Sequence, residues 1–354
     1  MDQWKQVVVE DNVVTGASLA AAGNNIATYN GGYAQHVAML NNSISHVWGG
    51  DREVMTYDNA GGAYFGAVVS VTGATITTAG DRIPLNRTGN ANSATGGGWV
   101  VEGGALIVLN GTGGGQIRRI IASTGPRGWV LDAPLGPLDL AGGSEPSFVQ
   151  VLPFRGRNIF HGNHLSDCGA VQFYGIGIEN VVAENRLERM AGVVSWGQWR
   201  QWHPTTPAPP LVTSWDAVSP GNTRVGGEMG CGANPNIFNV FERNDFLEGN
   251  TIVNYNTPEG ASYNWGSGYL LTSSNGGGAG GAASTRTETL TMNSFAVFRG
   301  NRIRSNGGIL VAGDSENVLV EHNSIEQSDL QICVTNTTRS IMLVGNDART
   351  ECAL

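Results

Sequence analysis

Short runs of alternating apolar and polar residues recur along the chain, and the same pattern returns around eight asparagines. In every case the residues four before, three before and two after the asparagine are apolar, as Val181, Val182 and Leu187 are around Asn185. The asparagine is the anchor of the alignment but the flanks are not, so the three apolar columns indicate a true repeat. The eight anchors are Asn12, Asn42, Asn163, Asn185, Asn244, Asn301, Asn323 and Asn346.

The spacing of the repeat predicts its architecture. Asn163 and Asn185 are 22 residues apart, as are Asn301 and Asn323, and Asn346 follows 23 residues later. Such a length holds about three short strands separated by turns, which is one coil of a β-solenoid whose strands pair with the coils above and below. Asparagines stacked at one turn can bond coil to coil and pair backbone groups that a bend leaves free. We therefore interpret the column as structural.

With this coil length and this asparagine column, residues 1–66 and 151–354 resemble the right-handed parallel β-helix proteins of the pectate lyase-like superfamily. The resemblance implies an all-β, right-handed, single-stranded parallel β-helix with about 22 residues per coil. Its implication for activity is broader, because the superfamily includes polysaccharide lyases, glycoside hydrolases, epimerases and phage tailspikes. The polygalacturonase carboxylate motifs are absent from this chain, and no subfamily is assigned.

Three stretches interrupt the repeat. Residues 67–150 read as hairpins with turns at glycine and predict a small inserted barrel-like or hairpin β-domain. Its GTGGGQ sequence lacks the GK[ST] ending and stands between strands, so it does not predict a phosphate loop. Loop insertions are expected at about 197–235 and 258–290. Both should leave one side of the solenoid, where binding sites on repeat scaffolds are usually built.

Composition narrows the class of protein. The chain has 52 glycines among 354 residues and nine more acidic than basic side chains. It shows no basic patch for nucleic acid and no run of eighteen apolar residues that could span a membrane. No signal peptide precedes WKQVVVEDN, where the pattern is already under way, and we expect that an export signal has been removed from a secreted or cell-surface protein. The cysteines fit no metal motif and are interpreted mainly as small buried hydrophobes: Cys168, Cys231, Cys333 and Cys352.

The strand after the turn carries a second predicted column, which is aromatic. It could fill the core, or it could form a row of rings on the outer face that stack on a sugar chain. Rings one coil apart, at about 4.8 Å, suit both interpretations. The outer-face interpretation gains support because the column leads into a tryptophan-rich loop. The column is Tyr57, Tyr174, Trp196 and Tyr255, and the loop contains Trp199 and Trp202.

A charged turn is the candidate for chemistry. Asn42 and Tyr57 are 15 residues apart, whereas the equivalent distance is 11 in the coils of Asn163, Asn185 and Asn244, so the four extra residues at GGDRE must bulge outward. Crowded carboxylates raise one another's pKa, which favours a catalytic group there. Alternatively, acids and arginines simply pair along a solvated edge. The turn contains Asp51, Arg52 and Glu53, and beside it we expect a file of His46, Asp167, Arg189 and Glu248.

We predict an enzyme that cleaves a polysaccharide or oligosaccharide by glycoside hydrolysis, without a cofactor. One carboxyl would act as an acid and another as a base or nucleophile. The predicted catalytic residues are Asp51, Glu53, Asp58, Asp167, Arg189 and His46. The predicted substrate-binding residues are Arg52, Tyr57, Tyr174, Trp196, Trp199, Trp202, Tyr255 and Glu228, with Glu228 and Asp216 as rival acids.

Two alternatives remain open at this level. A polysaccharide lyase would use an arginine base, Arg52 or Arg189, with calcium held by acids. A non-enzymatic tailspike, adhesin or surface filament would use the solenoid as a shaft and its loops for binding, and would show exposed apolar edges at both ends of the stack or a trimer seam. The net negative charge mildly disfavours a polyanionic substrate. The sequence specifies neither metal ligands nor an oligomeric state.

Overall fold

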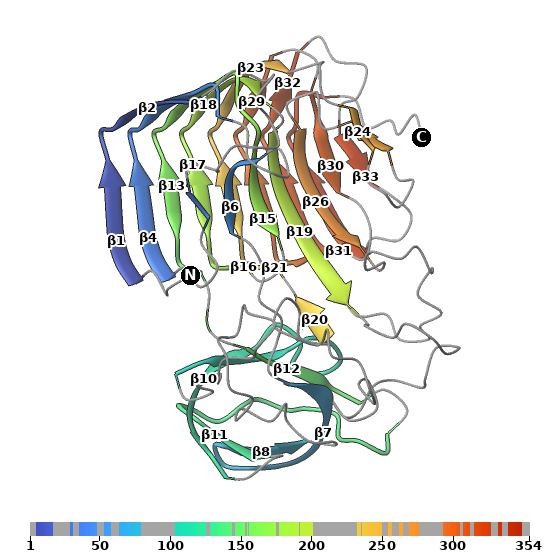
Figure 1. Ribbon diagram of the computed structural model, residues 1–354. Coiled ribbons are helices and arrows are strands. Elements are labelled where there is room, and N and C mark those ends of the chain that lie inside the picture. Colours follow the sequence, from blue (N-terminus) through green and yellow to red (C-terminus); the bar gives the residue numbers. More distant parts are fainter. Residues whose placement is uncertain are drawn as a thin grey trace.

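The computed structural model is built from strands joined by turns (Figure 1), and its described residues include no helix. The described residues are 5–16, 29–30, 35–47, 53–57, 64–78, 103–124, 128–143, 146–152, 154, 156–174, 177–190, 192–200, 232–234, 236–249, 254–256, 262–264, 269–275, 293–304, 307–311, 315–326, 332–334 and 339–348. Three stacked parallel sheets, here called A, B and C, form a β-helix. The predicted fold class is therefore confirmed.

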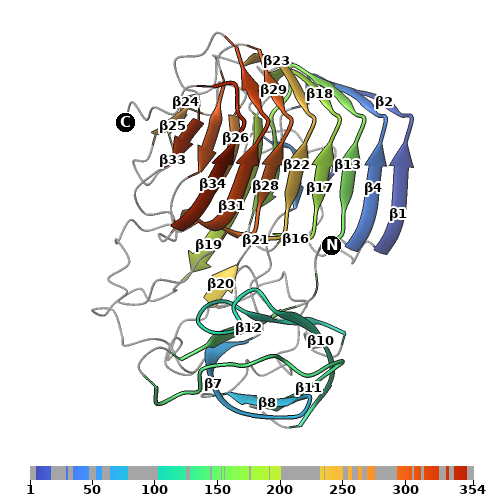
Figure 2. The same cartoon turned by 180° about the vertical axis from the view of Figure 1, so that it is seen from behind.

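Sheet A, seen from its outer side in Figure 2, contains the strand that precedes each anchor asparagine. Its main strands are β1 (Lys5–Glu10), β4 (Gln35–Leu40), β13 (Ile159–His161), β17 (Val181–Ala183), β22 (Val240–Glu242), β28 (Val297–Arg299), β31 (Ser315–Glu321) and β34 (Arg339–Val344). Its remaining strands are β16 (Gly177–Ile178), β21 (Asn236–Ile237) and β27 (Asn293–Ser294).

Sheets B and C complete each coil. Sheet B contains β2 (Val13–Thr15), β5 (Ser43–Ser45), β14 (His164–Ser166), β18 (Arg186–Met190), β23 (Asp245–Gly249), β29 (Arg302–Ile303) and β32 (Ser324–Ile325). Sheet C contains β3 (Tyr29–Asn30), β6 (Glu53–Tyr57), β15 (Ala170–Tyr174), β19 (Gly192–Arg200), β26 (Tyr269–Asn275), β30 (Ile309–Val311) and β33 (Ile332–Val334). Strand β20 (Gly232–Asn234) pairs antiparallel with β19, and β24 (Asn254–Asn256) forms a hairpin with β25 (Ser262–Asn264).

The eight anchor asparagines form one continuous ladder at the turn between sheets A and B. Asn185 is typical: its Oδ1 accepts hydrogen bonds from the backbone N–H and the Nδ2 of Asn163, at 2.9 and 3.0 Å. Its own Nδ2 donates to Asn244 Oδ1 and to the carbonyl oxygen of Phe160. The amides thus satisfy each other and the bent backbone, and the six from Asn42 to Asn323 do so while buried. The prediction that these asparagines occupy equivalent turns is confirmed.

The ladder also crosses the largest interruption of the repeat. Asn42 Nδ2 donates to Asn163 Oδ1 at 2.9 Å, although 121 residues separate them. Strands β4 and β13 pair in parallel with Phe160 opposite Met39. The coil of Asn42 therefore stacks directly on the coil of Asn163, as predicted.

A second, shorter ladder lies at the turn that enters sheet A. Asn158 Nδ2 donates to Asn180 Oδ1 at 2.9 Å, and Asn180 Nδ2 donates to Asn239 Oδ1 at 3.0 Å. At both turns the residue just before the asparagine has a left-handed backbone, with φ of 54° at Glu179 and 56° at Glu184. This conformation is costly for a residue with a side chain, and the asparagine bonds stabilise the bend that it produces.

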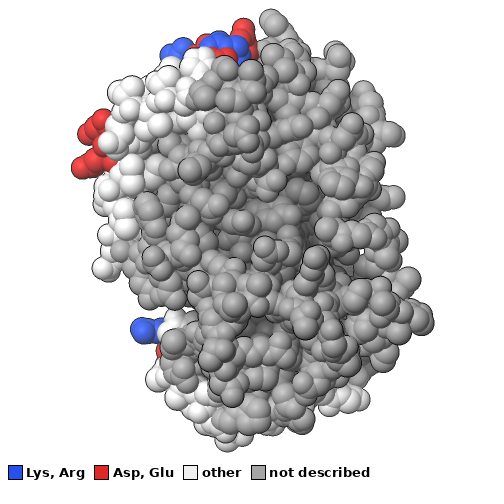
Figure 3. Space-filling view, in the orientation of Figure 1, with Lys and Arg blue, Asp and Glu red and all other residues white. Residues whose placement is uncertain are grey.

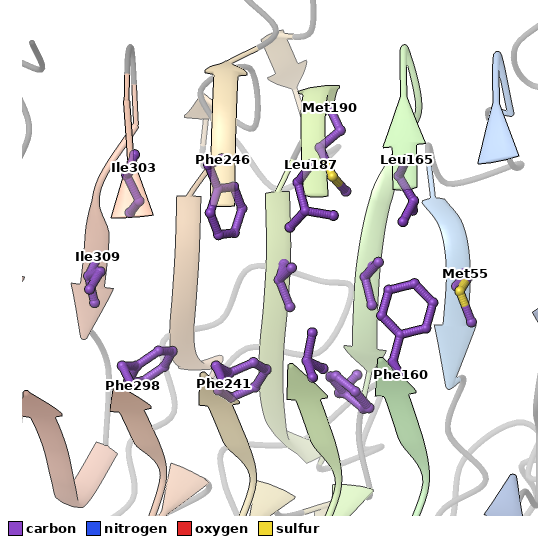
Figure 4. Close-up of a cluster of buried hydrophobic side chains, with 14 of the residues drawn as sticks. Met55, Phe160, Leu165, Leu187, Met190, Phe241, Phe246, Phe298, Ile303 and Ile309 are labelled. Carbon is purple, nitrogen blue, oxygen red and sulfur yellow. The ribbon is translucent and has the colours of Figure 1, made fainter. Parts of the chain in front are cut away.

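Two of the three apolar columns fill the core, and the third lies outside. The residues three before and two after each asparagine point inward, as Phe160 and Leu165 do (Figure 4). Stacked rings of Phe241 and Phe298, with centroids 4.9 Å apart, continue the first of these columns. The column four before the asparagine occupies the outer face of sheet A, where Ile159 is 43% exposed. Strand alternation explains the difference, because side chains at positions three and four before the asparagine point to opposite faces.

A separate closed barrel lies within the predicted inserted domain (Figures 1 and 2). It contains β7 (Tyr64–Thr72), β8 (Thr75–Thr78), β9 (Ala105–Val108), β10 (Ile117–Ser123), β11 (Gly128–Leu131) and β12 (Phe148–Leu152). Trp129 is buried in its core. Its first and last strands begin and end a few residues outside the predicted range of 67–150.

The GTGGGQ loop helps to attach this barrel to the β-helix. Phe238 and Phe295 stack at the turn that enters sheet A, with centroids 4.8 Å apart, and belong to an apolar cluster with barrel residues such as Ile107 and Phe148. A Cβ on Gly115 would lie 2.5 Å from the Phe295 ring, and its φ is +87°. Glycine is therefore required for both space and conformation. The loop has a structural role.

The described cysteines differ. Cys168 is a free thiol buried in the core, where burial raises its pKa to about 11. Cys333, buried on β33, is disulfide-bonded. Both are buried, as interpreted, but Cys333 is half of a disulfide, which the interpretation did not include. Cys231 and Cys352 lie outside the described residues.

Candidate functional site

Three members of the predicted file of charges, His46, Asp167 and Arg189, occupy equivalent positions at the turn between sheets B and C. Glu248 was misplaced by one residue, because a register shift between β18 and β23 puts it opposite Glu188. Arg189 forms a bidentate ion pair with Asp167, with Nε–Oδ1 and Nη2–Oδ2 distances of 2.7 and 2.9 Å. Its Nη1 lies 3.5 Å from Glu248 Oε2 and also contacts Glu188. These side chains are only partly exposed, with Asp167 at 33% and Glu188 at 22%. We call Arg189, Asp167, Glu188 and Glu248 the Arg189 cluster.

Electrostatics fix the charge states within the Arg189 cluster. Hydrogen bonds from Arg189 hold the pKa of Asp167 and of Glu188 below the usual carboxyl range. The same carboxylates raise the pKa of Arg189 above its usual value. Asp167 is thus an ionised carboxylate that could act as a base or nucleophile but not as an acid, and Arg189 cannot act as a base. For this pair the alternative of paired charges along an edge describes the geometry.

The backbone conformation of this turn is the same in three neighbouring coils. His46, Asp167 and Arg189 all have left-handed backbones, with φ of 55°, 51° and 49°. The N–H of His46 donates to the carbonyl oxygen of Ser166, and the N–H of Asp167 donates to that of Glu188. The charge of His46 also contributes to lowering the pKa of Asp167. Three predicted residues are therefore stacked neighbours at one turn.

Strand β6 begins at Glu53, the last residue of DRE, at the same edge of sheet C. Glu53 is in register with Ala170 of β15, three residues after Asp167. Asp51, Arg52 and Asp58 lie outside the described residues, and for Glu53 and Tyr57 the structure describes the strand position alone. The topology thus brings the strand that follows DRE beside the strand that follows Asp167.

The predicted aromatic column is correct for one pair and wrong for two members. Tyr174 of β15 is in register with Trp196 of β19. Tyr57, however, is opposite Phe173, because a bulge in β6 shifts the register between Ala170 and Val171. Val54 and Met55 are both buried beside this bulge, an arrangement that simple alternation does not predict.

Tyr255 does not belong to the column, since it pairs with Tyr263 in the β24–β25 hairpin. Its expected place is occupied by β26, where Ser273 is opposite Trp196. Strand β26 lies inside the range 258–290, so that part of the predicted loop insertion is a β-helix strand. The YLL run of β26 fits the sequence pattern of a buried strand as well as the segment that contains Tyr255 does.

Most of the tryptophan-rich insertion lies outside the described residues, including Trp202, Asp216 and Glu228. Trp199 lies on β19, which runs beyond Trp196 and pairs there with β20, placing Trp199 opposite Ala233. This strand extends sheet C toward the barrel (Figure 1). The insertion therefore leaves the coil from sheet C.

Further ion pairs occur that the sequence patterns did not single out. At the turn between sheets A and B, Arg243 pairs with Glu184 at 2.8 Å, and His161 Nε2 lies 3.2 Å from Glu184. On the outer face of sheet B, Arg304 and Asp245 form a bidentate pair at 2.7 and 2.8 Å. Figure 3 shows acidic and basic side chains gathered together near β18, β23 and β29. The sequence signal for these ion pairs is the presence of opposite charges at nearby positions of neighbouring coils.

The described part of the chain contains neither a metal-binding cluster nor a membrane-spanning helix. No group of three or more His, Cys, Asp or Glu side chains there is arranged to hold a metal ion. The carboxylates of the Arg189 cluster surround a guanidinium instead. The same residues include no helix long and apolar enough to cross a membrane.

The strand pairing defines a parallel β-helix with an inserted barrel. No family model and no curated protein matches the chain. Among solved structures, it is similar to the tailspike protein gp49 from Pseudomonas phage LKA1, with a TM-score of 0.35 and 10% identity over 90% of this chain and 48% of that chain. The chain thus spans about half the length of that tailspike.

Two further tailspikes are similar at lower scores. One is the Gp54 tailspike of Acinetobacter baumannii bacteriophage AP22, solved in complex with A. baumannii capsular saccharide, with a TM-score of 0.19 and 6% identity over 97% of this chain and 63% of that chain. The other is the Pseudomonas phage phi297 tailspike gp61, with a TM-score of 0.23 and 10% identity over 91% and 63%. The strand pairing, rather than this likeness, defines the fold.

Proposed function

We propose that the protein binds an extracellular polysaccharide across the outer face of sheet C and cleaves it by glycoside hydrolysis at the DRE turn. The observation that carries this proposal is the shared edge of sheet C, where β6 and β15 begin in register after the DRE turn and after Asp167. Carboxyls from neighbouring coils can thus approach one bound sugar, as hydrolysis requires.

The substrate-binding part of the proposal rests on sheet C. Tyr174 and Trp196 are in register, and they alternate along their strands with the buried residues Phe173 and Ser195. For Tyr174 and Trp196 the structure describes the strand position alone, and this register is the one that a row of rings one coil apart requires.

The charge states favour hydrolysis over elimination. Arg189 is held by carboxylates, so it is unsuited to the arginine-base role of a lyase. We assign it the role of a positioning residue that keeps Asp167 ionised and oriented. The protonated acid then comes from Asp51, Glu53 or Asp58, with Glu228 and Asp216 as rivals on the insertion.

A panel of polysaccharides provides the test. New reducing ends without absorbance from an unsaturated product report hydrolysis, whereas both signals together report elimination. On a substrate identified in this way, Asp51→Asn or Glu53→Gln should lower turnover about 100-fold to 10,000-fold, as loss of a general acid or base does. Thermal unfolding should be unchanged, since both replacements keep the shape of the side chain.

Two matched variants locate the site. Glu228→Gln tests the rival acid on the insertion. Asp11→Asn removes an exposed carboxylate at the turn between sheets A and B and should leave turnover intact. Full activity in the Asp51 and Glu53 variants beside an inactive Glu228 variant would move the site to the insertion. Binding without cleavage across the panel would support a non-enzymatic binding protein.

A further inference from the structure

Two bulges distort the strand pairing at the corner where the chain leaves sheet B for sheet C. The register between β18 and β23 shifts twice, so that Leu247 and Arg189 are extra residues in their strands. Bulges re-aim side chains and are common beside active sites. Here they place Glu248 opposite Glu188, and both carboxylates contact Nη1 of Arg189.

Arg189 does not bind the three carboxylates of its cluster equally. It donates two hydrogen bonds to Asp167, at 2.7 and 2.9 Å, and it contacts Glu188 closely. Glu248 has a single contact with Arg189, of 3.5 Å through Oε2, and its side chain is 58% exposed. Among the described residues no partner contacts Glu248 Oε1. Glu248 is therefore the carboxylate of the Arg189 cluster that can accept hydrogen bonds from a ligand.

The other arginines of sheet B are already paired with carboxylates of their own. The pairs are Arg186–Glu188, Arg302–Glu326 and Arg304–Asp245, at 3.8, 2.7 and 2.7 Å. Arg186 has the longest of these contacts and is 60% exposed. It stands three residues before Arg189, however, which is about 10 Å along a strand. The unbalanced charge at the corner is therefore the carboxylate of Glu248.

This balance of charge determines which sugars the corner can accept. Proteins bind carboxylates with arginine forks or with lysine, and the only lysine of the chain is Lys5, in β1 of sheet A. Among the described residues, a carboxylate on a bound sugar would find no unpaired arginine or lysine at this corner, and Glu248 would repel it. Repulsion of like charges is a common source of specificity. Sugar hydroxyl groups, in contrast, can donate hydrogen bonds to Glu248.

We propose that the sugar unit bound beside Asp167 carries no carboxylate, and that Glu248 selects it by accepting hydrogen bonds from its hydroxyl groups. The substrate class is thus a neutral polysaccharide rather than a polymer of uronic acids. This inference rests on the proposed function, because it concerns the same site. It gives Glu248 a role in specificity and leaves the acid and the base of hydrolysis with the residues already assigned to them.

Binding of matched polysaccharides to the full chain, measured by affinity electrophoresis, tests the proposal. Pullulan and mannan are each compared with a form carboxylated at C6, and polygalacturonic acid is compared with its carboxyl-reduced form. The uncharged member of a pair should bind at least about tenfold more tightly, and the difference should shrink as salt is added, because screening weakens the repulsion. Binding with this preference but without cleavage would overturn the proposed function alone. Failure to bind any member would overturn both.

Two matched variants assign the preference to Glu248. Glu248→Gln removes the charge and keeps the shape of the side chain, so the carboxylated member should bind more tightly and the preference should fall about fivefold to tenfold. Glu184→Gln removes a carboxylate of similar exposure, also paired with an arginine, at the turn between sheets A and B, and should leave the preference unchanged. Equal or tighter binding of the carboxylated member by the wild type would overturn the inference, as would equal effects of the two variants.

Discussion

Each coil bends sharply at two turns, and different interactions stabilise them. The turn between sheets A and B is closed by buried amides, since Asn163, Asn185 and Asn244 are each 1% exposed and bond to one another. The turn between sheets B and C uses the partly exposed charges of Asp167 and Arg189. The first turn is uniform in eight coils, whereas the second changes residue type from coil to coil and receives the extra residues at GGDRE.

The difference indicates which of the two turns tolerates a change of residue type. A buried amide that loses its partner leaves unpaired polar groups away from water, which costs free energy of folding. An exposed charge that loses its partner regains water, so the cost is small. The amide turn is therefore expected to be structural, and the ionic turn is free to acquire the bulge and charges that a binding site needs.

The largest expected effect comes from breaking the ladder in mid-stack. Asn185→Ala would leave the backbone N–H of Asn163 without its acceptor and the carbonyl of Phe160 without its side-chain donor, whereas Asn163 Nδ2 would keep its bonds to the carbonyls of Met39 and His161. We expect the free energy of unfolding to fall by about 2 to 6 kcal/mol, at roughly 1 to 3 kcal/mol for each of these two buried groups. Chemical denaturation measures it.

The matched replacement at the first rung of the ladder should cost far less. Asn12→Ala removes the same amide, but Asn12 is exposed and bonds within the ladder only to Asn42. A loss of about 1 kcal/mol or less is expected in the same denaturation experiment. Equal losses at Asn12 and Asn185 would show that burial does not set the energy of the ladder.

The ionic turn should be similarly tolerant. Arg189→Met removes the bidentate pair with Asp167, and the arginine side chain is 41% exposed. Surface ion pairs contribute about 0 to 1 kcal/mol, so stability should change within that range. If the proposed function holds, turnover should fall by more than the change in stability explains, because Asp167 loses the contacts that orient it. A loss of stability comparable to that of Asn185→Ala would contradict the comparison.

The smallest effect is a dependence on pH. In the folded state the pKa values of Asp167 and Glu188 are depressed by Arg189, so these groups stabilise the fold above their unfolded pKa near about 4. That contribution is lost as pH falls through the depressed folded values, and it is fully present at higher pH. The melting temperature should therefore fall modestly below about pH 4, and less so in Asp167→Asn. The amide ladder does not titrate, so an unchanged pH profile in this variant would contradict the role of the pair.

The sequence predicted the features that repeat and missed those that depend on register. All eight rungs could be found because the apolar residues around each asparagine keep the same spacing. The second ladder was available in the same way, since Asn158, Asn180 and Asn239 each stand five residues before an anchor, but it spans only three rungs. The outward position of Ile159 could not be read from an apolar residue type alone.

The misplaced aromatics show the limit more clearly. Alignment by counting assumed unbroken alternation through β6, whereas the buried pair Val54 and Met55 introduces a bulge that moves Tyr57 by one residue. Two apolar segments could each have followed β19 in sheet C, and local pattern did not separate the one containing Tyr255 from β26. Pairing between distant segments decided both cases. The candidate site was therefore predicted as a set of neighbouring turns rather than as an ordered row of side chains.

The central claim is that the coil carrying the DRE turn stacks directly on the coil carrying Asp167, with the barrel looped out between them. An engineered disulfide tests it. Ser43 and His164 are partners in register on β5 and β14, although 121 residues separate them, and adjacent strands lie about 4.8 Å apart, within reach of a disulfide. Ser43→Cys combined with His164→Cys should form an intramolecular disulfide under mild oxidation of the folded protein, detected by mass spectrometry of proteolytic fragments. Two free thiols after oxidation, with the protein still folded, would contradict the stacking and remove the basis for a shared site.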